Sequence, residues 1–399
     1  MGGASPEPTT ADSRDPETNI DVLFVAANTR SLAVNRRPII VALHALGLRV
    51  GALVPDDEFV SDVHALGVQT WAYSLERHAT GLSGEVRRFF RLRRLIARIA
   101  PRVVMAYSAK PVIIGVPAAR LAGVREVYSL ATGLGYVFSR WDRRTLLIRQ
   151  AVVYGYALAG WLSNTFFFQN PDDRDELRSN WLFRRFVRTA VVPGSGVDLA
   201  EFQFTWAPVE PVTFLFMGRL LEEKGIRDFV EAARKVRSTC QSARFVALGE
   251  RDASLLNAVS EDQLDCWVRE GVVEFPGRVR DVRTFLARAS VVVLPSYYRE
   301  GVPRALLEAL STGRAILTCD TPGCRETVED GVNGWKVPPR SPDILAERMR
   351  RFLADPTLVV DMGRRSRAIA EARFADHIIS SEMLAQMEIA RTANRMHGT

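Results

Sequence analysis

The feature that most constrains the fold is a regular alternation of short apolar runs with helical stretches along this chain of 399 residues. The runs are continuous and rich in Val, Ile, Leu and Phe. Such an arrangement is typical of a parallel sheet that helices cover on both faces. In the first half the predicted strands are 20–26, 49–54, 103–107, 126–131 and 165–169, with helices predicted at 84–100 and 111–121.

Turn residues divide this alternation into two parts. The sequence PGSGVD at 193–198, followed by Pro208 and Pro211, interrupts the pattern before it restarts. The strands predicted after the interruption are 212–217, 245–248, 272–275, 291–295, 315–318 and 334–337. We therefore expect an α/β protein with two doubly wound, Rossmann-like parallel-sheet domains. Ligands of such sheets bind beyond the carboxyl ends of the strands, so the inter-domain cleft is the expected site.

The pattern also predicts bounds for the parts of the chain. Residues 1–19 are acidic and contain Pro and Thr, and we expect them to be a disordered leader. Residues 20–205 are predicted to form the N-terminal domain and residues 206–374 the C-terminal domain. Residues 375–399 are mostly helical in pattern and are expected to pack back on the N-terminal domain.

Composition excludes several classes of protein. A hydrophobic content of 47% and a charged content of 25% are typical of a globular enzyme. The four cysteines show no CxxC spacing, which argues against a disulfide scaffold or a structural zinc site and fits the cytoplasm. The longest apolar run, 151–162, is too short to span a bilayer. No GxGxxG follows a predicted strand, which disfavours a dehydrogenase.

The net charge of +7 indicates an anionic partner, and much of the basic charge lies in the predicted helix at 84–100. On a helical wheel Phe89, Leu92, Ile96 and Ile99 lie on one side, which can dock on the sheet. The opposite side is expected to attract an anionic membrane surface. An ordinary solvated helix face is the alternative, and nucleic acid is not expected because no binding motif accompanies the charge. The arginines of this basic face are Arg87, Arg91, Arg94 and Arg98.

The segment SYYREGVPRALLEAL at 296–310 carries the clearest indication of chemistry. It follows a buried strand and opens a helix, with Pro303 near the first helical position. The N–H groups at such a helix start form an anion site, and Gly301 permits close approach of a ligand. Glu300 and Glu308 are too far apart for an acid–base pair and suit the two ends of a ligand about 10 Å long. The alternative is a capping residue and a solvated surface acid.

Two further segments end strands of the same half. In FMGRLLEEKGI at 216–226, Arg219 and Lys224 are cations that can hold a diphosphate together, although a surface Arg paired with a neighbouring Glu is a common alternative. In FPGR at 275–278, the glycine can let backbone groups pair with a nucleobase edge. A plain turn explains this second segment equally well.

Taken together, GRLLEEKG, FPGR, and EGVPRALLEA followed by DTPGCRETVEDGVNGWKVPP resemble the retaining glycosyltransferases of family 4, which have the GT-B fold. In the first half RLAGVREVYSLATGLGYVF, FQNPDD and VVPGSGVD are similar to one branch of that family. That branch adds sugars to polyprenyl-diphosphate-linked acceptors in polysaccharide or glycan assembly. The resemblance implies a metal-independent, retaining hexosyltransferase that uses a nucleoside diphosphate sugar, expected to be a UDP-sugar, and no cofactor. It also implies a cytoplasmic, peripheral location on the inner face of the plasma membrane.

The resemblance implies roles for individual residues as well. Arg219 and Lys224 are expected to grip the donor diphosphate, Glu300 to contact the sugar hydroxyls and Glu308 to hold the ribose. The implied catalytic residues are Glu300, Arg219 and Lys224. The implied donor-binding residues are Gly218, Arg219, Lys224, Gly277, Arg278, Glu300, Gly301, Val302, Pro303 and Glu308. The candidate acceptor-binding residues are Lys110, which can hold a phosphate or be a solvated Lys, Thr132, which stands where many relatives have a His, and Gly133.

Other functions are weighed against this one. A DxD sequence at Asp173-Arg174-Asp175 is predicted to be the first turn of a helix rather than a metal site. A nucleotide-sugar 2-epimerase of similar architecture is the main alternative enzyme, and it needs no acceptor. A non-catalytic protein that binds sugar nucleotides or serves as a membrane scaffold is the third reading, in which replacement of Glu300 has no consequence.

Overall fold

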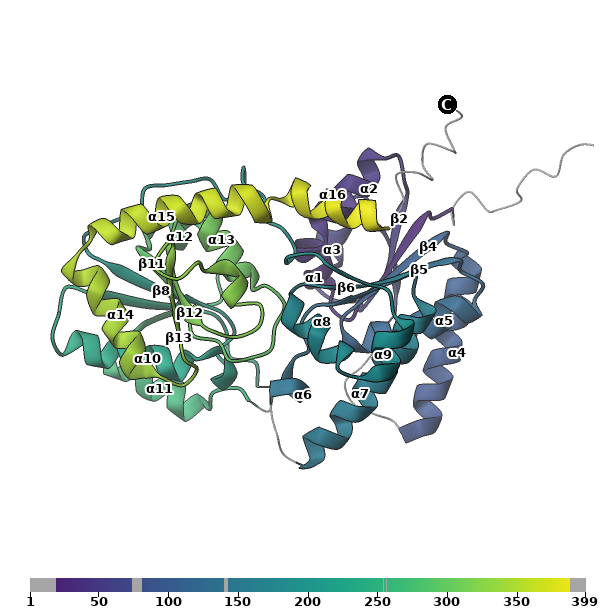
Figure 1. Cartoon of the computed structure of the whole chain (residues 1–399), viewed down its shortest axis with the longest axis horizontal. Helices are drawn as coiled ribbons and strands as arrows, with labels where there is room; N and C mark the ends of the chain where they lie inside the picture. Colours follow the sequence, from purple (N-terminus) through teal and green to yellow (C-terminus); the bar gives the residue numbers. More distant parts are fainter. Residues whose placement is uncertain (1–18, 74–80, 140–142, 254, 256, 388–399) are drawn as a thin grey trace, which may run out of the picture.

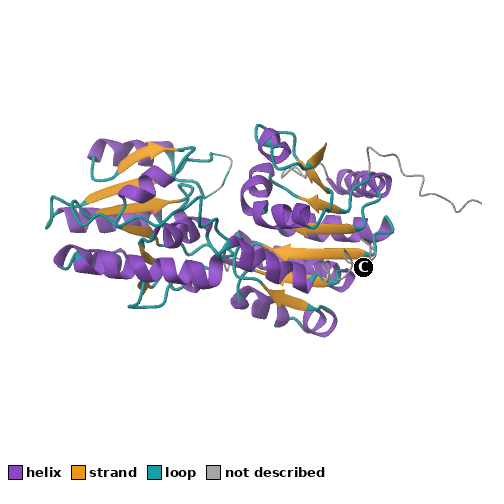
Figure 2. Ribbon diagram, turned by 90° about the horizontal axis from the view of Figure 1, so that it is seen from above, coloured by secondary structure: helices purple, strands orange, loops and turns teal. Residues whose placement is uncertain are grey.

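The computed structural model describes residues 19–73, 81–139, 143–253, 255 and 257–387. It contains two parallel sheets that lie side by side, each between layers of helices (Figure 1 and Figure 2). The predicted α/β class with two doubly wound sheets is confirmed. Residues 1–18 of the expected leader lie outside the described residues. Of the helix expected at 375–399, the structure describes residues 375–387.

The first sheet has seven strands in the order β3-β2-β1-β4-β5-β6-β7. Two of them, β3 and β7, were missed by the sequence pattern because they are edge strands with no buried residue, so they lack an apolar run. The strands are β1 (Val22–Val25), β2 (Val50–Val54), β3 (Gln69–Ala72), β4 (Val103–Tyr107), β5 (Glu126–Ala131), β6 (Thr165–Phe168) and β7 (Thr189–Val191).

Helices cover both faces of this sheet. One face packs against α4 (Gly81–Ile99), α5 (Val116–Leu121) and α7 (Arg143–Leu162). The other face packs against α1 (Thr29–Asn35), α2 (Arg37–Ala45) and α3 (Val60–His64). Between strands and helices lie a π-helix at Pro111–Gly115 and three short helices, α6 (Tyr136–Ser139), α8 (Pro171–Arg178) and α9 (Trp181–Phe186).

The second sheet has six strands in the order β10-β9-β8-β11-β12-β13, around one continuous core. Its strand β10 begins two residues later than predicted and continues through Pro276 with an irregular register. The strands are β8 (Thr213–Met217), β9 (Arg244–Leu248), β10 (Glu274–Gly277), β11 (Val291–Leu294), β12 (Ala315–Cys319) and β13 (Gly334–Val337). The α-helices are α10 (Ile226–Arg237), α11 (Glu261–Glu270), α12 (Arg283–Arg288), α13 (Arg304–Thr312), α14 (Pro342–Ala354) and α15 (Thr357–Ile369).

The chain crosses between the two sheets twice, and the two crossings pair with each other. Val197 on the outward crossing bridges to Ala375 on the return, where the Val197 N–H donates to the Phe374 carbonyl at 2.9 Å. The returning chain continues as α16 (Asp376–Gln386), which lies beside α2 of the first sheet (Figure 1). The Tyr128 hydroxyl donates to the Met387 carbonyl at 2.6 Å, so the last described residues are anchored in the first domain.

Candidate active site

Loops at the carboxyl ends of both parallel sheets meet in one cleft. From the first domain come Thr132 and Gly133 after β5, and from the second comes the turn that connects β11 to α13. The Gly301 N–H in this turn donates to the Thr132 carbonyl at 3.1 Å. A Cβ atom built on Gly133, whose φ is +106°, would lie 2.6 Å from Glu300 Cα. The structure therefore places these predicted donor and acceptor residues against each other.

Glu300 lies at the centre of the turn, and its carboxylate is largely buried. It accepts a hydrogen bond from Ser296 Oγ at 2.9 Å and forms a short ion pair with the Lys224 ammonium. Lys224 ends a 3₁₀ turn at Glu222–Lys224, and the Glu223 carbonyl accepts hydrogen bonds from the N–H groups of Tyr297 and Tyr298 at 2.9 and 3.0 Å. The two loops are thus fastened together, with Lys224 beside Glu300.

Arg219 lines a pocket at the ends of β8 and β9. The pocket has a volume of about 200 Å³ and includes Gly218, Gly249 and Ala305, the last from the first turn of α13. Arg278, which follows β10, borders this pocket and a neighbouring one of about 650 Å³. That larger pocket is also lined by residues of the first domain: Arg30, Val34, Glu58, Phe59, Ser61 and Asp62. Exposed cations therefore surround a hollow that opens between the domains.

The start of α13 differs in detail from the expectation. Pro303 is the N-cap residue rather than a helical one, and it has no N–H group to donate. The Gly301 N–H is bonded to the first domain, so in this arrangement it is not directed at a ligand. The first intrahelical bond is donated by Leu306 to Pro303, which leaves the N–H groups of Arg304 and Ala305 at the open helix end.

Glu308 lies further along α13 and is largely buried. Its carboxylate accepts a hydrogen bond from Arg304 at 2.8 Å, and Arg304 also donates to the Val34 carbonyl of the first domain at 3.0 Å. Burial raises the pKa of the Glu308 carboxyl, and the nearby Arg304 guanidinium opposes that rise. Glu308 is thus neither solvated nor unpaired, which contradicts the surface-acid alternative.

The candidate acceptor residues of the first domain have different surroundings. Thr132 Oγ1 is 3.1 Å from Ser108 Oγ, and Ser108 has a left-handed backbone with φ of +70°. Lys110 is exposed and precedes the π-helix that follows β4. Thr132 and Gly133 are therefore at the cleft.

The DxD sequence lies at the start of α8, with Asp173 in the first turn as predicted and Asp175 just beyond it. Asn170 is the N-cap, and its side-chain oxygen accepts from the Asp173 N–H at 2.8 Å. Asp173 is buried and lies 3.3 Å from Arg299 Nε, whereas Asp175 pairs with the neighbouring Arg174. Burial raises the pKa of Asp173 to about 6, and Arg299 opposes the rise. Among the described residues, no group of three or more His, Cys, Asp and Glu could hold a metal ion.

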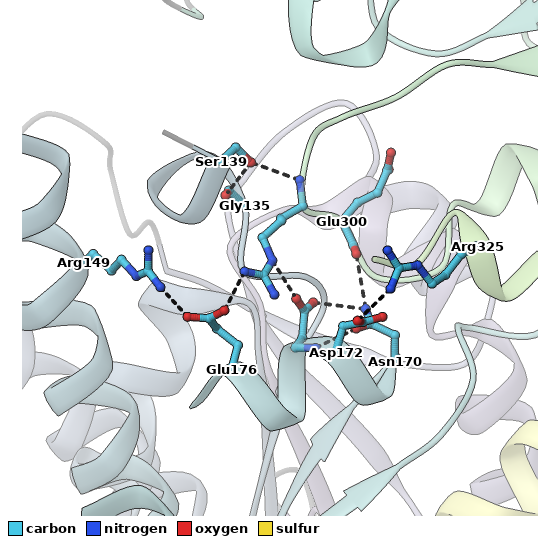
Figure 3. Close-up of polar contacts among 10 residues, drawn as sticks. Gly135, Ser139, Arg149, Asn170, Asp172, Glu176, Glu300 and Arg325 are labelled. Carbon is cyan, nitrogen blue, oxygen red and sulfur yellow. Dashed lines mark hydrogen bonds and ion pairs between the residues drawn. The ribbon is translucent and has the colours of Figure 1, made fainter. Parts of the chain in front are cut away.

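Sequence reasoning missed several residues that build this site, among them Ser296, Asn170 and Arg299. Figure 3 shows that Asn170 and its neighbours on α8 reach across to the turn that carries Glu300. Asn170 had a sequence signal, since an Asn-Pro pair after an apolar strand is typical of a helix N-cap. Arg299 had none, because its partners come from the other domain.

The predicted amphipathic character of α4 is confirmed. Leu92, Ile96 and Ile99 are buried in the first core, and Phe89 packs partly against it. The basic face, Arg87, Arg91, Arg94 and Arg98, is exposed. No helix within the described residues is long and apolar enough to cross a membrane.

Comparisons with known proteins agree with this architecture. A family model described as glycosyl transferase 4-like matches residues 21–170, and one described as glycosyl transferases group 1 matches residues 211–355. Solved structures of sucrose-phosphate synthase from Thermosynechococcus elongatus and of Anabaena HepE in complex with UDP superpose with TM-scores of 0.76 and 0.74. The alignments include 94% and 92% of this chain, respectively, and the full length of each solved chain, at 17% sequence identity. This similarity shows that the chain has the GT-B fold.

Relatives with assigned activities are glycosyltransferases. The chain is 25% identical over 88% of its length to N,N'-diacetylbacillosaminyl-diphospho-undecaprenol alpha-1,3-N-acetylgalactosaminyltransferase of Campylobacter jejuni, 93% of which is covered. It is 29% identical over 48% of its length to the colanic acid biosynthesis glycosyltransferase WcaL of Escherichia coli, described as putative, and spans 49% of that protein. The two family models lie in succession over the two sheets that form the cleft. The chain therefore belongs to the glycosyltransferases of the GT-B fold.

Proposed function

We propose that the protein is a retaining, metal-independent glycosyltransferase. It transfers a hexose or N-acetylhexosamine from a UDP-sugar to a sugar carried on a polyprenyl diphosphate, during assembly of a surface polysaccharide or glycan. The observation that carries the proposal is the contact between Lys224 and Glu300 in the cleft. Ala305, five residues after Glu300 in the sequence, lines the same pocket as Arg219. The acceptor named in the Campylobacter relative and the UDP bound by HepE support this choice of substrates.

The chemistry of the transfer explains why these groups are needed. Cleavage of the sugar–diphosphate bond builds negative charge on the leaving oxygen while the sugar becomes cation-like. Arg219 and Lys224 stabilise the leaving charge, together with the N–H groups at the start of α13. The Glu300 carboxylate accepts hydrogen bonds from the sugar hydroxyls and stabilises the positive ring. Because these residues supply the charge, the proposed transfer requires no metal ion and no cofactor besides the nucleotide.

The remaining predicted residues complete the two substrate sites. Gly277 and Arg278 lie beside the nucleobase, Gly218 and Val302 line the path of the diphosphate, and Glu308 holds the ribose. In the first domain Thr132 and Gly133 face the acceptor, with Lys110 as a contact for its phosphate. The cleft position of Thr132 and Gly133 supports the first of these assignments.

A transfer assay with purified protein tests the proposal. We expect transfer from a UDP-sugar to a polyprenyl-diphosphate-linked sugar, with the product in the same anomeric configuration as the donor. A chelator should change the rate by less than about twofold, since the charged side chains replace a metal. Loss of transfer in chelator would refute metal independence. Release of an epimerised sugar from donor alone, with no transfer, would instead support the epimerase alternative.

We further propose that the first domain docks on an anionic membrane surface, on the inner face of the plasma membrane. Helices α4 and α7 cover the same face of the first sheet. Helix α5 contacts both of them. On this side of the domain, helix α7 exposes an apolar stripe to solvent, with Leu147 77% and Trp161 62% exposed. The stripe comprises Leu147, Ala151, Tyr154, Leu158 and Trp161, spaced three or four residues apart on one side of the helix. Basic and apolar groups exposed on one side of a domain are the combination that binds lipid surfaces.

Co-sedimentation with vesicles tests this docking. Changing Arg87, Arg91, Arg94 and Arg98 to Gln should lower binding to anionic vesicles by close to a thousandfold, since each charge contributes about 1 kcal/mol near the surface and tenfold in affinity corresponds to about 1.4 kcal/mol. A control variant loses four exposed arginines of the second domain, Arg244, Arg269, Arg283 and Arg288, and should bind as the wild type does. Equal loss in both variants would mean that net charge, not this face, attracts the vesicle.

A further inference from the structure

The residue before Glu300 joins the two domains through its side chain. Arg299 Nη1 donates to Glu176 Oε2 on α8 at 2.9 Å, and its Nε lies 3.3 Å from Asp173 Oδ1 on the same helix. Glu176 is also paired with Arg149 of α7, so two carboxylates face two guanidinium groups (Figure 3). The two positive and two negative charges balance, and their mutual attraction offsets the free-energy cost of removing them from water.

The backbone beside Arg299 is also bound to the first domain. The Gly135 N–H donates to the Arg299 carbonyl at 2.7 Å, and the Arg299 N–H donates to Ser139 Oγ at 3.1 Å (Figure 3). Asn170 Nδ2 donates to the Glu300 carbonyl at 3.3 Å. Three consecutive peptide groups are therefore bonded to the first domain while the Glu300 side chain points to Lys224 in the second domain.

Glu300 is thus oriented from both sides of the cleft. Its carboxylate is bonded within the second domain, but the direction of its backbone depends on contacts that exist only when the domains are together. A buried ion pair contributes little net stability compared with apolar packing, and its best-supported use is to specify one geometry. An error of about 1 Å in the position of a reacting group can lower a rate by about a hundredfold.

We propose that Arg299, held by Asp173 and Glu176, is an interdomain latch that positions Glu300 when the cleft closes. Arg299 is a positioning residue, since it acts on the substrate through its neighbour. The proposal rests on the proposed function, in which Glu300 contacts the donor sugar. The latch itself is a property of the fold and can be measured without any substrate.

A second ion pair across the same interface provides the control. Arg325 donates to Asp172 of α8 at 2.9 Å, but both side chains are about one-third exposed and Arg325 is distant in sequence from Glu300. Exposed pairs contribute little. If Arg299 only stabilises the contact between the two domains, replacing Arg299 or Arg325 should lower kcat by comparable amounts. If it is a latch, Arg299 should matter far more.

Hydrogen exchange and kinetics of Arg299→Met and Arg325→Met test the latch. In Arg299→Met we expect the peptide containing the Gly135 amide to exchange at least tenfold faster, with β8 and α10 unchanged. We expect kcat to fall by about a hundredfold and the Kd for UDP to stay within about twofold. Adding Glu176→Gln to Arg299→Met should cause little further loss, because the pair acts as one unit.

Each result has a defined meaning. Unchanged exchange at Gly135 in Arg299→Met, or equal loss of kcat in Arg299→Met and Arg325→Met, overturns the latch. A large fall in UDP affinity overturns it too, because the defect would then lie in the donor site itself. If the wild type transfers no sugar while exchange changes as expected, the proposed function fails and the latch stands.

Discussion

Glu300→Gln is expected to lower kcat by about two to three orders of magnitude, the loss typical of removing one group that stabilises transition-state charge. The amide keeps the shape of the carboxylate and can still accept the hydrogen bond from Ser296. What it loses is the negative charge, which stabilises the cation-like sugar and balances the buried Lys224 ammonium. The Kd for UDP should change by less than about threefold, since Glu300 is assigned to the sugar rather than to the diphosphate.

Steady-state transfer rates and calorimetric UDP binding measure these two effects. Glu222→Gln is the matched control, because Glu222 lies two residues from Lys224 but pairs with Arg227 at a more exposed position. It should keep more than half of the wild-type kcat. If Glu300→Gln is as active as this control, the carboxylate has no role in the transition state.

Gly133→Ala is expected to lower kcat/KM by about a hundredfold through obstruction of the closed cleft. The added methyl group would lie 2.5 Å from Gly301 N and 2.6 Å from Glu300 Cα, closer than any real Cβ contact. These neighbours are backbone atoms, which cannot rotate away as a side chain can. The two domains must therefore separate, and Glu300 moves away from the acceptor side.

Gly123→Ala separates this effect from backbone strain. Gly123 also has a positive φ, +89°, but a Cβ there meets nothing within 4 Å. Both variants should lose about 1–2 kcal/mol of unfolding free energy from the left-handed conformation. Only Gly133→Ala should lose activity, measured as kcat/KM alongside thermal unfolding. Equal activity of the two variants would show that the closed contact is not needed for turnover.

The parts of the structure that could be predicted from the sequence depend on local patterns. Continuous apolar runs predicted the central strands of both sheets, because buried parallel strands need apolar residues on both faces. The edge strands β3 and β7 escaped, since their half-exposed residues carry no such pattern. Similarly, the start of α8 was predicted from its acidic residues, which the helix dipole favours there.

The sequence predicted only those parts of the site whose residues all come from one domain. Lys224 and Glu300 follow adjacent strand ends of one sheet, so their proximity follows from strand order. By contrast, the pairing of Arg299 with Asp173 and the hydrogen bond from Gly301 to Thr132 depend on how two domains are oriented. No periodicity in either half encodes that orientation. The same reason explains why Gly301 was expected to face a ligand and instead bonds the first domain.

The position of UDP in a crystal of the wild-type protein tests the central claim most directly. We predict that its diphosphate oxygens lie within hydrogen-bond distance of both the Arg219 guanidinium and the Lys224 ammonium, with the start of α13 beside them. A diphosphate bound away from either cation, or at the first domain alone, would contradict the account.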